Sequence, residues 1–331
     1  MKRTILVGVG GRSRMWRNAA AFQYPQSAAL VGLCDHNPGR LALAQRELRE
    51  KGMSGDIPVF PPEAFEARIL ELGARQVIVT SRDSTHADFI VRALQAGCDV
   101  ITEKPMTIDA PSCRAICEAV ARTGRQVRVT FNYRYAPPRR QVKELIQSGV
   151  IGRPLSVEFK WLLDTSHGAD YFRRWHRNKA NSGGLLVHKA THHFDLVNWW
   201  ISSVPARVAA FGARLFYRPE QAQRYGLANR GERCSDCPES GRCPVFLDIK
   251  GNARKGKPAH DISPVALEAV ARIDAIFDIE RGINGLTAAE RQAARHQLSR
   301  PLIEGLQRWL RAERDRLSKH NPVAKAIDYM F

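Results

Sequence analysis

The sequence predicts an α/β protein in which a doubly wound parallel sheet comes first, a shortened α+β domain follows, and an all-α tail comes last. Over residues 1–135, short β-branched runs alternate with stretches whose apolar residues recur at helical spacing. This alternation is typical of βαβ units with helices on both faces of a sheet. Longer extended runs begin at Leu155, and strand signals stop after Cys243. We therefore expect domains at residues 1–135, 136–252 and 253–331.

The elements of the first domain follow from their apolar runs and flanking residues. Asn37-Pro38 marks the start of a helix after the second strand. Ala87–Gln95 and Ala110–Ala121 have helical spacing, which places helices between later strands. The predicted strands are Thr4–Val7, Ala29–Cys34, Gln76–Thr80, Asp99–Thr102 and Gln126–Thr130.

The rest of the chain changes character twice. Two strands are expected, at Leu155–Leu163 and Arg207–Tyr217, with a helix through His192–Ile201 between them. Residues 251–258 look like a linker, and helical patterns alone follow. The first spans Ser263–Arg281, with Ser263-Pro264 as N-cap and first helical residue. Thr287 and Glu290 fit a capping box, Pro301 should break or restart that helix, and Leu302–Leu317 continues the helical spacing.

Composition excludes several classes of protein. The 331 residues include no run of about 18 apolar residues, and the start lacks a signal-peptide pattern, so we expect a cytoplasmic protein with no membrane partner. The net charge is +18, and residues 254–331 hold 14 basic and 10 acidic residues, which leaves +14 in residues 1–253. No block of five or six like charges occurs, so a nucleic-acid partner is not favoured.

A glycine-rich turn follows the first strand and opens a helix. Gly8 would permit the tight turn, and Gly10, beside Gly11, would let the backbone approach a pyrophosphate. The third position of the fingerprint is Ser13 rather than glycine or alanine. Asp35 ends the second strand, where a carboxylate holds ribose hydroxyls and repels a 2′-phosphate, although it could instead cap a helix. We expect NAD, with NADP less favoured.

Two further groups of polar residues suggest proton-transfer chemistry. Lys104 lies in Glu103-Lys104-Pro105 at the carboxyl end of a predicted strand, where it could hold a substrate hydroxyl or be an ordinary surface lysine. The bond before Pro105 is a candidate cis peptide. His188, His192 and Asp195 would share one face of a single helix, as a general base, a metal site or plain helix-face residues.

Three closely spaced cysteines form a separate pattern. Cys234 and Cys237 are in C-x-x-C spacing, and Cys243 follows shortly before a proline. Such a set suits zinc or an iron–sulfur cluster better than a disulfide in a cytosolic protein, although no fourth ligand is evident and free loop thiols fit nearly as well. We hypothesise a structural metal site here.

Residues 1–252 resemble the glucose–fructose oxidoreductase, inositol dehydrogenase and rhizopine-catabolism family (Gfo/Idh/MocA). The resemblance is carried by T-S-R-D-S-T-H-A-D, by A-L-Q-A-G-C-D-V-I-T-E-K-P, by N-Y-R-Y-A-P and by the G-G-x-x-x-x-x-x-x-H-x-x-D pattern. It implies a Rossmann-type domain, a mixed-sheet substrate domain, and hydride transfer between NAD(P) and a carbon of a sugar or cyclitol.

The resemblance also implies roles for individual residues. Lys104 and His192 would bind and deprotonate the reacting hydroxyl. His188 stands where the family usually has an aspartate, four residues before the active-site histidine, which leaves open which group is the base. The remaining residues would contact the cofactor: Gly8, Gly10, Arg12 and Ser13 the pyrophosphate, Asp35 the ribose, and Ser81, His86 and Glu103 the nicotinamide side.

Residues 255–330 resemble a different family, the insertion-sequence transposases of the IS66 type. The similarity rests on helical stretches such as K-G-K-P-A-H-D-I-S-P-V-A-L-E and carries no catalytic acid of that family. We therefore expect an NAD-dependent sugar or cyclitol oxidoreductase whose substrate domain is cut short, which also disfavours a homo-oligomer. The alternatives are a transposase-related fusion product without a complete nuclease site and a non-functional chimera that binds NAD at most.

Overall fold

The structure is a computed structural model of the 331-residue chain. It describes residues 1–163, 165–168, 170–231, 234–244, 246, 264–283, 285–317, 324, 327 and 328. These residues group into two compact units, of which the first is Met1–Ala228 with 242–245 and the second is Asn229–Gly241 with Phe246–Phe331. The predicted linker at 251–258 and the boundary at 252/253 lie outside the described residues.

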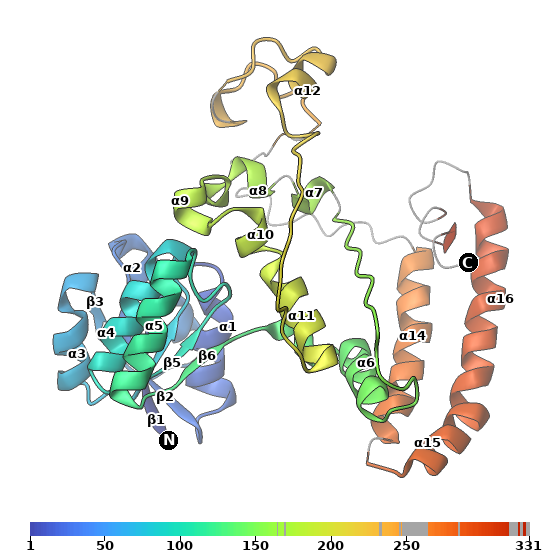
Figure 1. The fold of residues 1–331 in the computed structure, drawn as a ribbon, viewed down its shortest axis with the longest axis horizontal. Helices are drawn as coiled ribbons and strands as arrows, with labels where there is room; N and C mark the ends of the chain where they lie inside the picture. Colours follow the sequence, from blue (N-terminus) through green and yellow to red (C-terminus); the bar gives the residue numbers. More distant parts are fainter. Residues whose placement is uncertain are drawn as a thin grey trace. The chain divides into compact units, whose positions relative to one another are not determined.

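The first unit contains the predicted doubly wound sheet (Figure 1). Six parallel strands pair in the order β3-β2-β1-β4-β5-β6, so the chain starts in the middle of the sheet and winds outward to each edge. The two-residue strand β3 was not predicted, because its run is too short to show an alternation. The strands are β1 (Lys2–Val7), β2 (Ala28–Cys34), β3 (Val59–Phe60), β4 (Gln76–Val79), β5 (Asp99–Thr102) and β6 (Val127–Val129).

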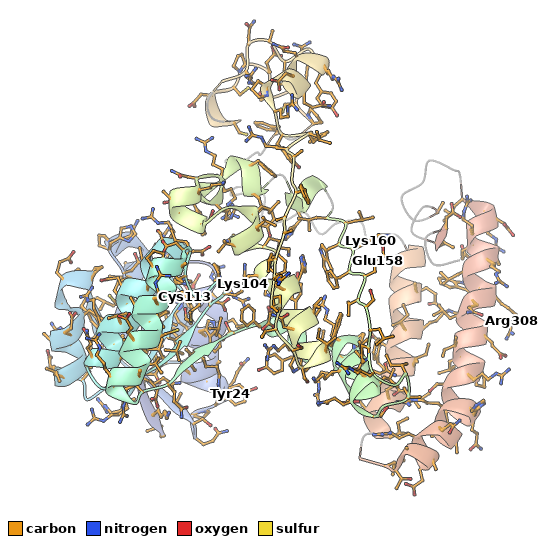
Figure 2. The ribbon with its side chains drawn as sticks, viewed as in Figure 1. Tyr24, Lys104, Cys113, Glu158, Lys160 and Arg308 are labelled. Atoms are coloured by element: carbon orange, nitrogen blue, oxygen red, sulfur yellow. The ribbon has the colours of Figure 1, made fainter. Side chains whose placement is uncertain are left out.

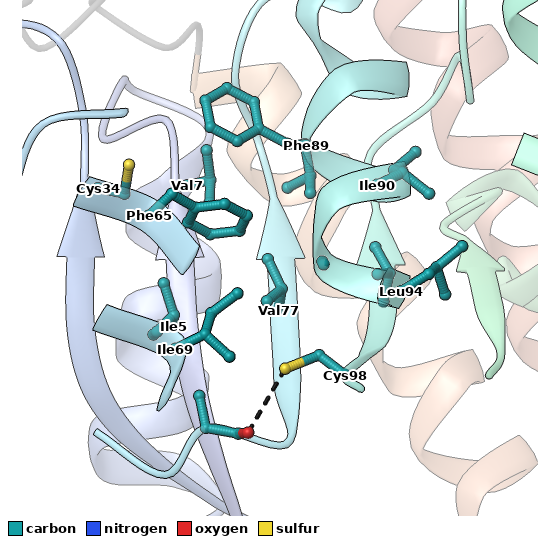
Figure 3. Packing of buried hydrophobic residues seen from close by; sticks show 14 of the residues in the cluster. Ile5, Val7, Cys34, Phe65, Ile69, Val77, Phe89, Ile90, Leu94 and Cys98 are labelled. Carbon is teal, nitrogen blue, oxygen red and sulfur yellow. Dashed lines mark hydrogen bonds between the residues drawn. The ribbon is translucent and has the colours of Figure 1, made fainter. Parts of the chain in front are cut away.

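Helices cover both faces of this sheet because alternate strand residues point to opposite sides. Ile5 and Val7 of β1 join the cluster beneath α3, α4 and α5, whereas Leu6 joins the cluster beneath α1 and α2. Figure 3 shows the first cluster, in which the Cys98 thiol donates a 3.4 Å hydrogen bond to the Ala74 carbonyl. The helices are α1 (Ser13–Asn18), α2 (Pro38–Glu50), α3 (Phe65–Glu71), α4 (His86–Gln95) and α5 (Ala110–Thr123).

The second half of the first unit is helical, with long connections. Helix α6 (Pro137–Gln147) packs against α11 (Thr191–Ile201), and the buried Lys143 of α6 donates to the Trp199 and Trp200 carbonyls at the end of α11. Short helices precede and follow α11: α7 (Thr165–Gly168), α8 (Asp170–Arg173), α9 (Lys179–Ser182), α10 (Leu185–His188) and α12 (Pro219–Arg224).

The two strands predicted at Leu155–Leu163 and Arg207–Tyr217 are not formed. Both segments are extended, but neither pairs with another strand among the described residues, and Leu155 and Phe211 are exposed. A strand is stabilised by backbone hydrogen bonds to a neighbour, so alternation without a partner does not make a sheet. Glu158 and Lys160 lie along the first of these segments and form a 2.6 Å ion pair (Figure 2).

The second unit contains the predicted helical tail. Helix α14 (Pro264–Gly282) packs against α16 (Arg300–Arg316), with α15 (Ala288–Ala294) between them in the chain. Thr287 and Glu290 form the predicted capping box, whereas the predicted N-cap Ser263 lies outside the described residues. A π-helical turn at Arg295–Ser299 joins α15 to α16 with no interruption of the helical backbone, and Pro301 stands in the first turn of α16. The predicted break at this proline therefore does not occur. None of the described helices is long and apolar enough to cross a lipid bilayer.

Candidate active site

A cavity of about 1210 Å³ opens at the carboxyl ends of the central strands. This edge is where ligands bind in doubly wound sheets, because the loops that follow the strands diverge there. Of the residues predicted for cofactor binding or catalysis, all but Ser13 line this cavity. The lining residues from that prediction are Gly8, Gly10, Gly11, Arg12, Asp35, Ser81, His86, Glu103, Lys104, His188 and His192.

The glycine-rich turn after β1 has two kinds of glycine. Gly8 has φ +83°, and a Cβ there would lie 2.4 Å from the Ser81 backbone, so the protein's own packing requires glycine. Gly10 and Gly11 have open space within 4 Å of a Cβ position. Internal packing therefore does not explain these two glycines, whereas close approach of a ligand to the backbone would.

Ser13 holds the turn closed instead of facing the cavity. Its side chain is fully buried, and its hydroxyl donates a 2.6 Å hydrogen bond to the Gly10 carbonyl. The hydroxyl is therefore used inside the turn, and the expected contact of Ser13 with a pyrophosphate stays a prediction. Thr80 supports the other side of the turn by donating to the Gly8 carbonyl at 2.6 Å.

Asp35 lies buried at the end of β2 and lines the cavity. One carboxylate oxygen accepts the Val9 N–H at 2.7 Å, and the other accepts the Asn37 N–H at 2.8 Å. These bonds fix the carboxylate beside the glycine-rich turn. Because a carboxylate has about four acceptor positions, capacity remains for ribose hydroxyls.

Glu103 accepts two hydrogen bonds at the end of β5. The guanidinium Nε of Arg12 donates to Oε1 at 2.7 Å, and the indole N–H of Trp16 donates to the same oxygen at 2.9 Å. Arg12 is therefore held toward Glu103 rather than directly over the glycines. This pair ties the loop after β1 to the loop after β5.

Lys104 follows Glu103, and its peptide bond to Pro105 is cis, as predicted. Its Nζ donates a 2.8 Å hydrogen bond to the backbone carbonyl of His188, which joins the sheet edge to α10 (Figure 2 marks Lys104). Burial lowers the pKa of this ammonium, and the positive charge of Lys189 adds to this shift, whereas the carboxylates of Asp83 and Glu103 oppose it. A lysine with a lowered pKa is suited to binding and proton transfer at a hydroxyl group.

His192 is buried in the first turn of α11 and stacks on Tyr133, with ring centroids 4.0 Å apart. Its Nδ1 is buried, with no hydrogen-bond partner among the described residues, which leaves Nε2 as the ring nitrogen that can meet a ligand in the cavity. Burial lowers the pKa of His192 to about 3, and the charges of Lys104 and Lys189 act in the same direction. The imidazole is therefore neutral at physiological pH.

His188, His192 and Asp195 do not form the single helix face predicted for them. The helix breaks at Lys189–Ala190 between α10 and α11, and each of the three residues has a different partner. His188 Nδ1 lies 2.5 Å from Oδ2 of Asp83, and Asp195 pairs with Arg134. These tertiary contacts override the local periodicity on which the prediction rested.

Ser81 lies in the loop that follows β4, and His86 is the first residue of α4. Both ring nitrogens of His86 face backbone carbonyls, Nδ1 that of Pro105 at 2.8 Å and Nε2 that of Ser81 at 3.1 Å. The fully buried ring therefore braces the two loops that border the cavity. The Ser81 hydroxyl shares a 2.8 Å hydrogen bond with that of Thr85.

Sequence reasoning missed three residues that build this site. Asp83 holds His188, Tyr133 stacks on His192, and Lys189 donates a 2.9 Å hydrogen bond from Nζ to the Tyr133 hydroxyl. All three lie inside the quoted motifs or next to a predicted histidine. Their side-chain types were the available signal, but their meeting point depends on the tertiary fold.

The three cysteines predicted as metal ligands do not form a metal site among the described residues. No group of three histidine, cysteine, aspartate or glutamate side chains in that part of the chain is arranged to hold a metal ion. Cys234, Cys237 and Cys243 are free thiols, and the Cys237 sulfur accepts a 3.3 Å hydrogen bond from the Gly231 N–H. This backbone contact is one that a loop thiol makes without a metal.

Comparison with known families gives three matches along the chain. Residues 2–131 match the NAD-binding Rossmann fold of the Gfo/Idh/MocA oxidoreductase family, and residues 143–234 match the C-terminal α/β domain of that family. Residues 250–331 match the IS66 transposase family. The matches agree with both resemblances that the sequence motifs carry.

Individual relatives cover the oxidoreductase part. The protein YteT of Bacillus subtilis (strain 168) is 39% identical over 247 residues, which are 74% of this chain and 57% of YteT. An inositol 2-dehydrogenase/D-chiro-inositol 3-dehydrogenase of Lactiplantibacillus plantarum is 26% identical over 56% of this chain and 48% of its own length. The chain thus spans about half the length of these relatives.

A solved structure shows the shared fold. The scyllo-inositol dehydrogenase of Lactobacillus casei, crystallised with NAD(H) and scyllo-inositol, superimposes with a TM-score of 0.50 at 24% identity. The match covers 61% of this chain and 56% of the other.

Proposed function

Because residues 2–131 and 143–234 belong to the Gfo/Idh/MocA oxidoreductase family, we propose that this chain binds NAD and transfers a hydride between the nicotinamide and a hydroxyl-bearing carbon of a sugar or cyclitol. Residues 250–331 belong to the IS66 transposase family, so the chain is a fusion. The observation that carries the proposal is a single cavity. Its walls hold the glycine-rich turn and Asp35, which we call the nucleotide end, together with Lys104 and His192, which we call the polyol end. A dinucleotide and a small polyol would therefore meet in one space.

The nucleotide end fits NAD. The turn at Gly10 and Gly11 leaves room for close approach of a pyrophosphate, and the backbone of this turn precedes the start of α1. Asp35 would accept the ribose hydroxyls, and its negative charge disfavours the 2′-phosphate of NADP. NAD, when bound, supplies the hydride acceptor or donor.

The polyol end provides the proton chemistry. Lys104 is held by the His188 carbonyl and has two further N–H donors for a substrate hydroxyl. The accessible Nε2 of the neutral His192 would take the hydroxyl proton as the hydride leaves the same carbon. Asp83 would orient His188, and His188 in turn would orient Lys104.

Titration of the purified full-length chain with NAD tests the first part of this proposal. We expect saturable quenching of tryptophan fluorescence by NAD and weaker quenching by NADP. Turnover is then followed by NADH absorbance with inositols and aldoses, with Lys104→Ala and His192→Gln as inactive controls that still bind NAD. Failure of the folded protein to bind NAD would reject the proposal.

A second candidate is a chimera that binds NAD without turning over a polyol. The unpaired extended segments at residues 155–163 and 207–217 favour this alternative, because they belong to the half that would enclose the substrate. Saturable NAD binding with no turnover across the polyol panel would select it over the enzyme.

A further inference from the structure

The polyol end of the cavity contains two lysine ammonium groups whose only described partners are neutral. Lys104 Nζ donates to the backbone carbonyl of His188, and Lys189 Nζ donates to the hydroxyl of Tyr133. Both lysines line the cavity, and Lys189 is buried. Each ammonium has three donors, so each retains donors that these contacts do not use.

The carboxylates near these lysines are engaged elsewhere. Asp83 bonds to His188, and Glu103 accepts from Arg12 and Trp16. Among the described residues, no ion pair joins Lys104 or Lys189 to a carboxylate. Asp83 and Glu103 do raise the pKa of Lys104, but neither bonds to it, and a buried charge is costly unless it is paired. An anion in direct contact with both ammonium groups would therefore stabilise this part of the cavity.

The electrostatic environment of His192 agrees with this charge imbalance. Lys104, Lys189 and Arg139 all lower its pKa, and no carboxylate is among the main groups that act on it. Arg139 also lies over the ring of Tyr133, 4.1 Å from the centroid, on which His192 stacks. An anion placed between the two lysines would offset these charges and make His192 a stronger base.

We propose that Lys104 and Lys189 form a binding site for an anionic substituent of the substrate, so that the polyol is a sugar acid or a sugar phosphate rather than a neutral sugar or cyclitol. This inference rests on the proposed function and names its substrate class. The cofactor does not supply this anion, because its pyrophosphate belongs at the turn after β1, whereas Lys189 contacts Tyr133 beyond β6. A carboxylate or a phosphate has an oxygen that can accept from each of the two ammonium groups that line the cavity.

The test uses the full-length chain saturated with NADH and measures binding by calorimetry. The probes are matched pairs, D-glucose with D-glucuronate and D-galactose with D-galacturonate, and D-glucose 6-phosphate distinguishes phosphate from carboxylate. We expect at least one acidic probe to bind about tenfold or more tightly than its neutral counterpart, since charge-assisted hydrogen bonds are the stronger ones. NADH binding is measured first, because a folded chain that does not bind NADH would contradict the proposed function, whereas a chain that binds NADH without preferring acidic probes would contradict only this inference.

Variants then test whether Lys189 causes the preference for the acidic probe. Lys189→Met should remove most of the preference for the acidic probe while NADH binding stays within about twofold, and Lys189→Arg should retain it. Lys160→Met is the matched control, because it removes the same charge from an exposed residue that pairs with Glu158 and does not line the cavity. Equal binding of acidic and neutral probes, no binding of any acidic probe, or an unchanged preference in Lys189→Met would overturn the inference.

Discussion

Nδ1 of His188 lies 2.5 Å from Oδ2 of Asp83, and this contact joins α10 to the loop that follows β4. Both side chains are nearly buried. The carbonyl of the same histidine accepts the hydrogen bond from Lys104. A chain of contacts therefore runs from a carboxylate of the nucleotide-binding half to the lysine proposed to hold the substrate hydroxyl.

Asp83→Asn should lower kcat by about tenfold to a hundredfold, because the neutral amide no longer holds His188 firmly and Lys104 loses its fixed acceptor. NAD binding should change by no more than about twofold. Steady-state kinetics and NAD titration measure the two effects. Asp88→Asn is the control, because Asp88 also lines the cavity but pairs with Arg92 near the surface. If both variants behave alike, Asp83 has no special role in positioning.

The sequence was sufficient to predict five of the six strands of the sheet, all but β3. β-branched runs predicted β1, β2, β4, β5 and β6, and the glycine-rich turn and Asp35, chosen from the sequence as cofactor-binding residues, line the cavity at the strand ends. These features are local, because strand alternation and a glycine at positive φ are written in neighbouring residues. Lys104 was found in the same way, from its place directly after a strand.

The contacts of the polyol end could not be predicted from local pattern. Asp83 and His188 are 105 residues apart, and Lys189 and Tyr133 are 56 apart. Helical spacing predicted that His188 and His192 share one helix face, but α10 ends at His188 and α11 begins at Thr191, and His188 and Lys189 bond to residues far away in the chain. The strands predicted at residues 155–163 and 207–217 are not formed for the same reason, because a strand needs a hydrogen-bonding neighbour from elsewhere in the chain.

His192 should make the stability of the chain depend on pH. Its folded-state pKa of about 3 lies below the ordinary value of 6.5, so the unfolded chain binds one more proton between these limits. The free energy of unfolding should therefore fall as pH decreases from about 6.5, by up to about 1.4 kcal/mol per pH unit. Urea denaturation from pH 7.5 to 4.5 measures this slope. His192→Gln should flatten it, and parallel curves for the two proteins would contradict the assignment.

The glycine-rich turn offers a paired test of packing against ligand binding. Gly8→Ala places a Cβ against the Ser81 backbone at positive φ, so it should destabilise the fold by about 2 kcal/mol or more. Gly10→Ala meets no atom within 4 Å, so it should leave thermal stability nearly unchanged and weaken NAD binding by about tenfold. Thermal denaturation and NAD titration separate the two effects. Normal NAD binding by Gly10→Ala would argue against pyrophosphate at this turn.

Asp35 should set the preference between NAD and NADP. Asp35→Asn keeps one acceptor oxygen but removes the negative charge that would repel a 2′-phosphate. We expect NAD binding to weaken by about tenfold and the ratio of NADP to NAD affinity to rise. Asp99→Asn serves as the control, since Asp99 pairs with Lys2 at the start of β5 and does not line the cavity. An unchanged affinity ratio in Asp35→Asn would place the ribose elsewhere.

The unpaired extended segments should limit the solubility of the chain. Leu155 is 93% exposed and Phe211 is 100% exposed, each on a segment with free backbone hydrogen-bonding groups, and such edges promote association between chains. The double variant Leu155→Lys with Phe211→Lys should reduce light scattering at high protein concentration, whereas the melting temperature should hardly change because neither side chain is packed. Leu70→Lys is the control, since Leu70 is 73% exposed on helix α3, whose backbone is satisfied internally. A marked drop in the melting temperature of the double variant would contradict this prediction. It would mean that both side chains are buried in solution, because the two segments pair with other strands.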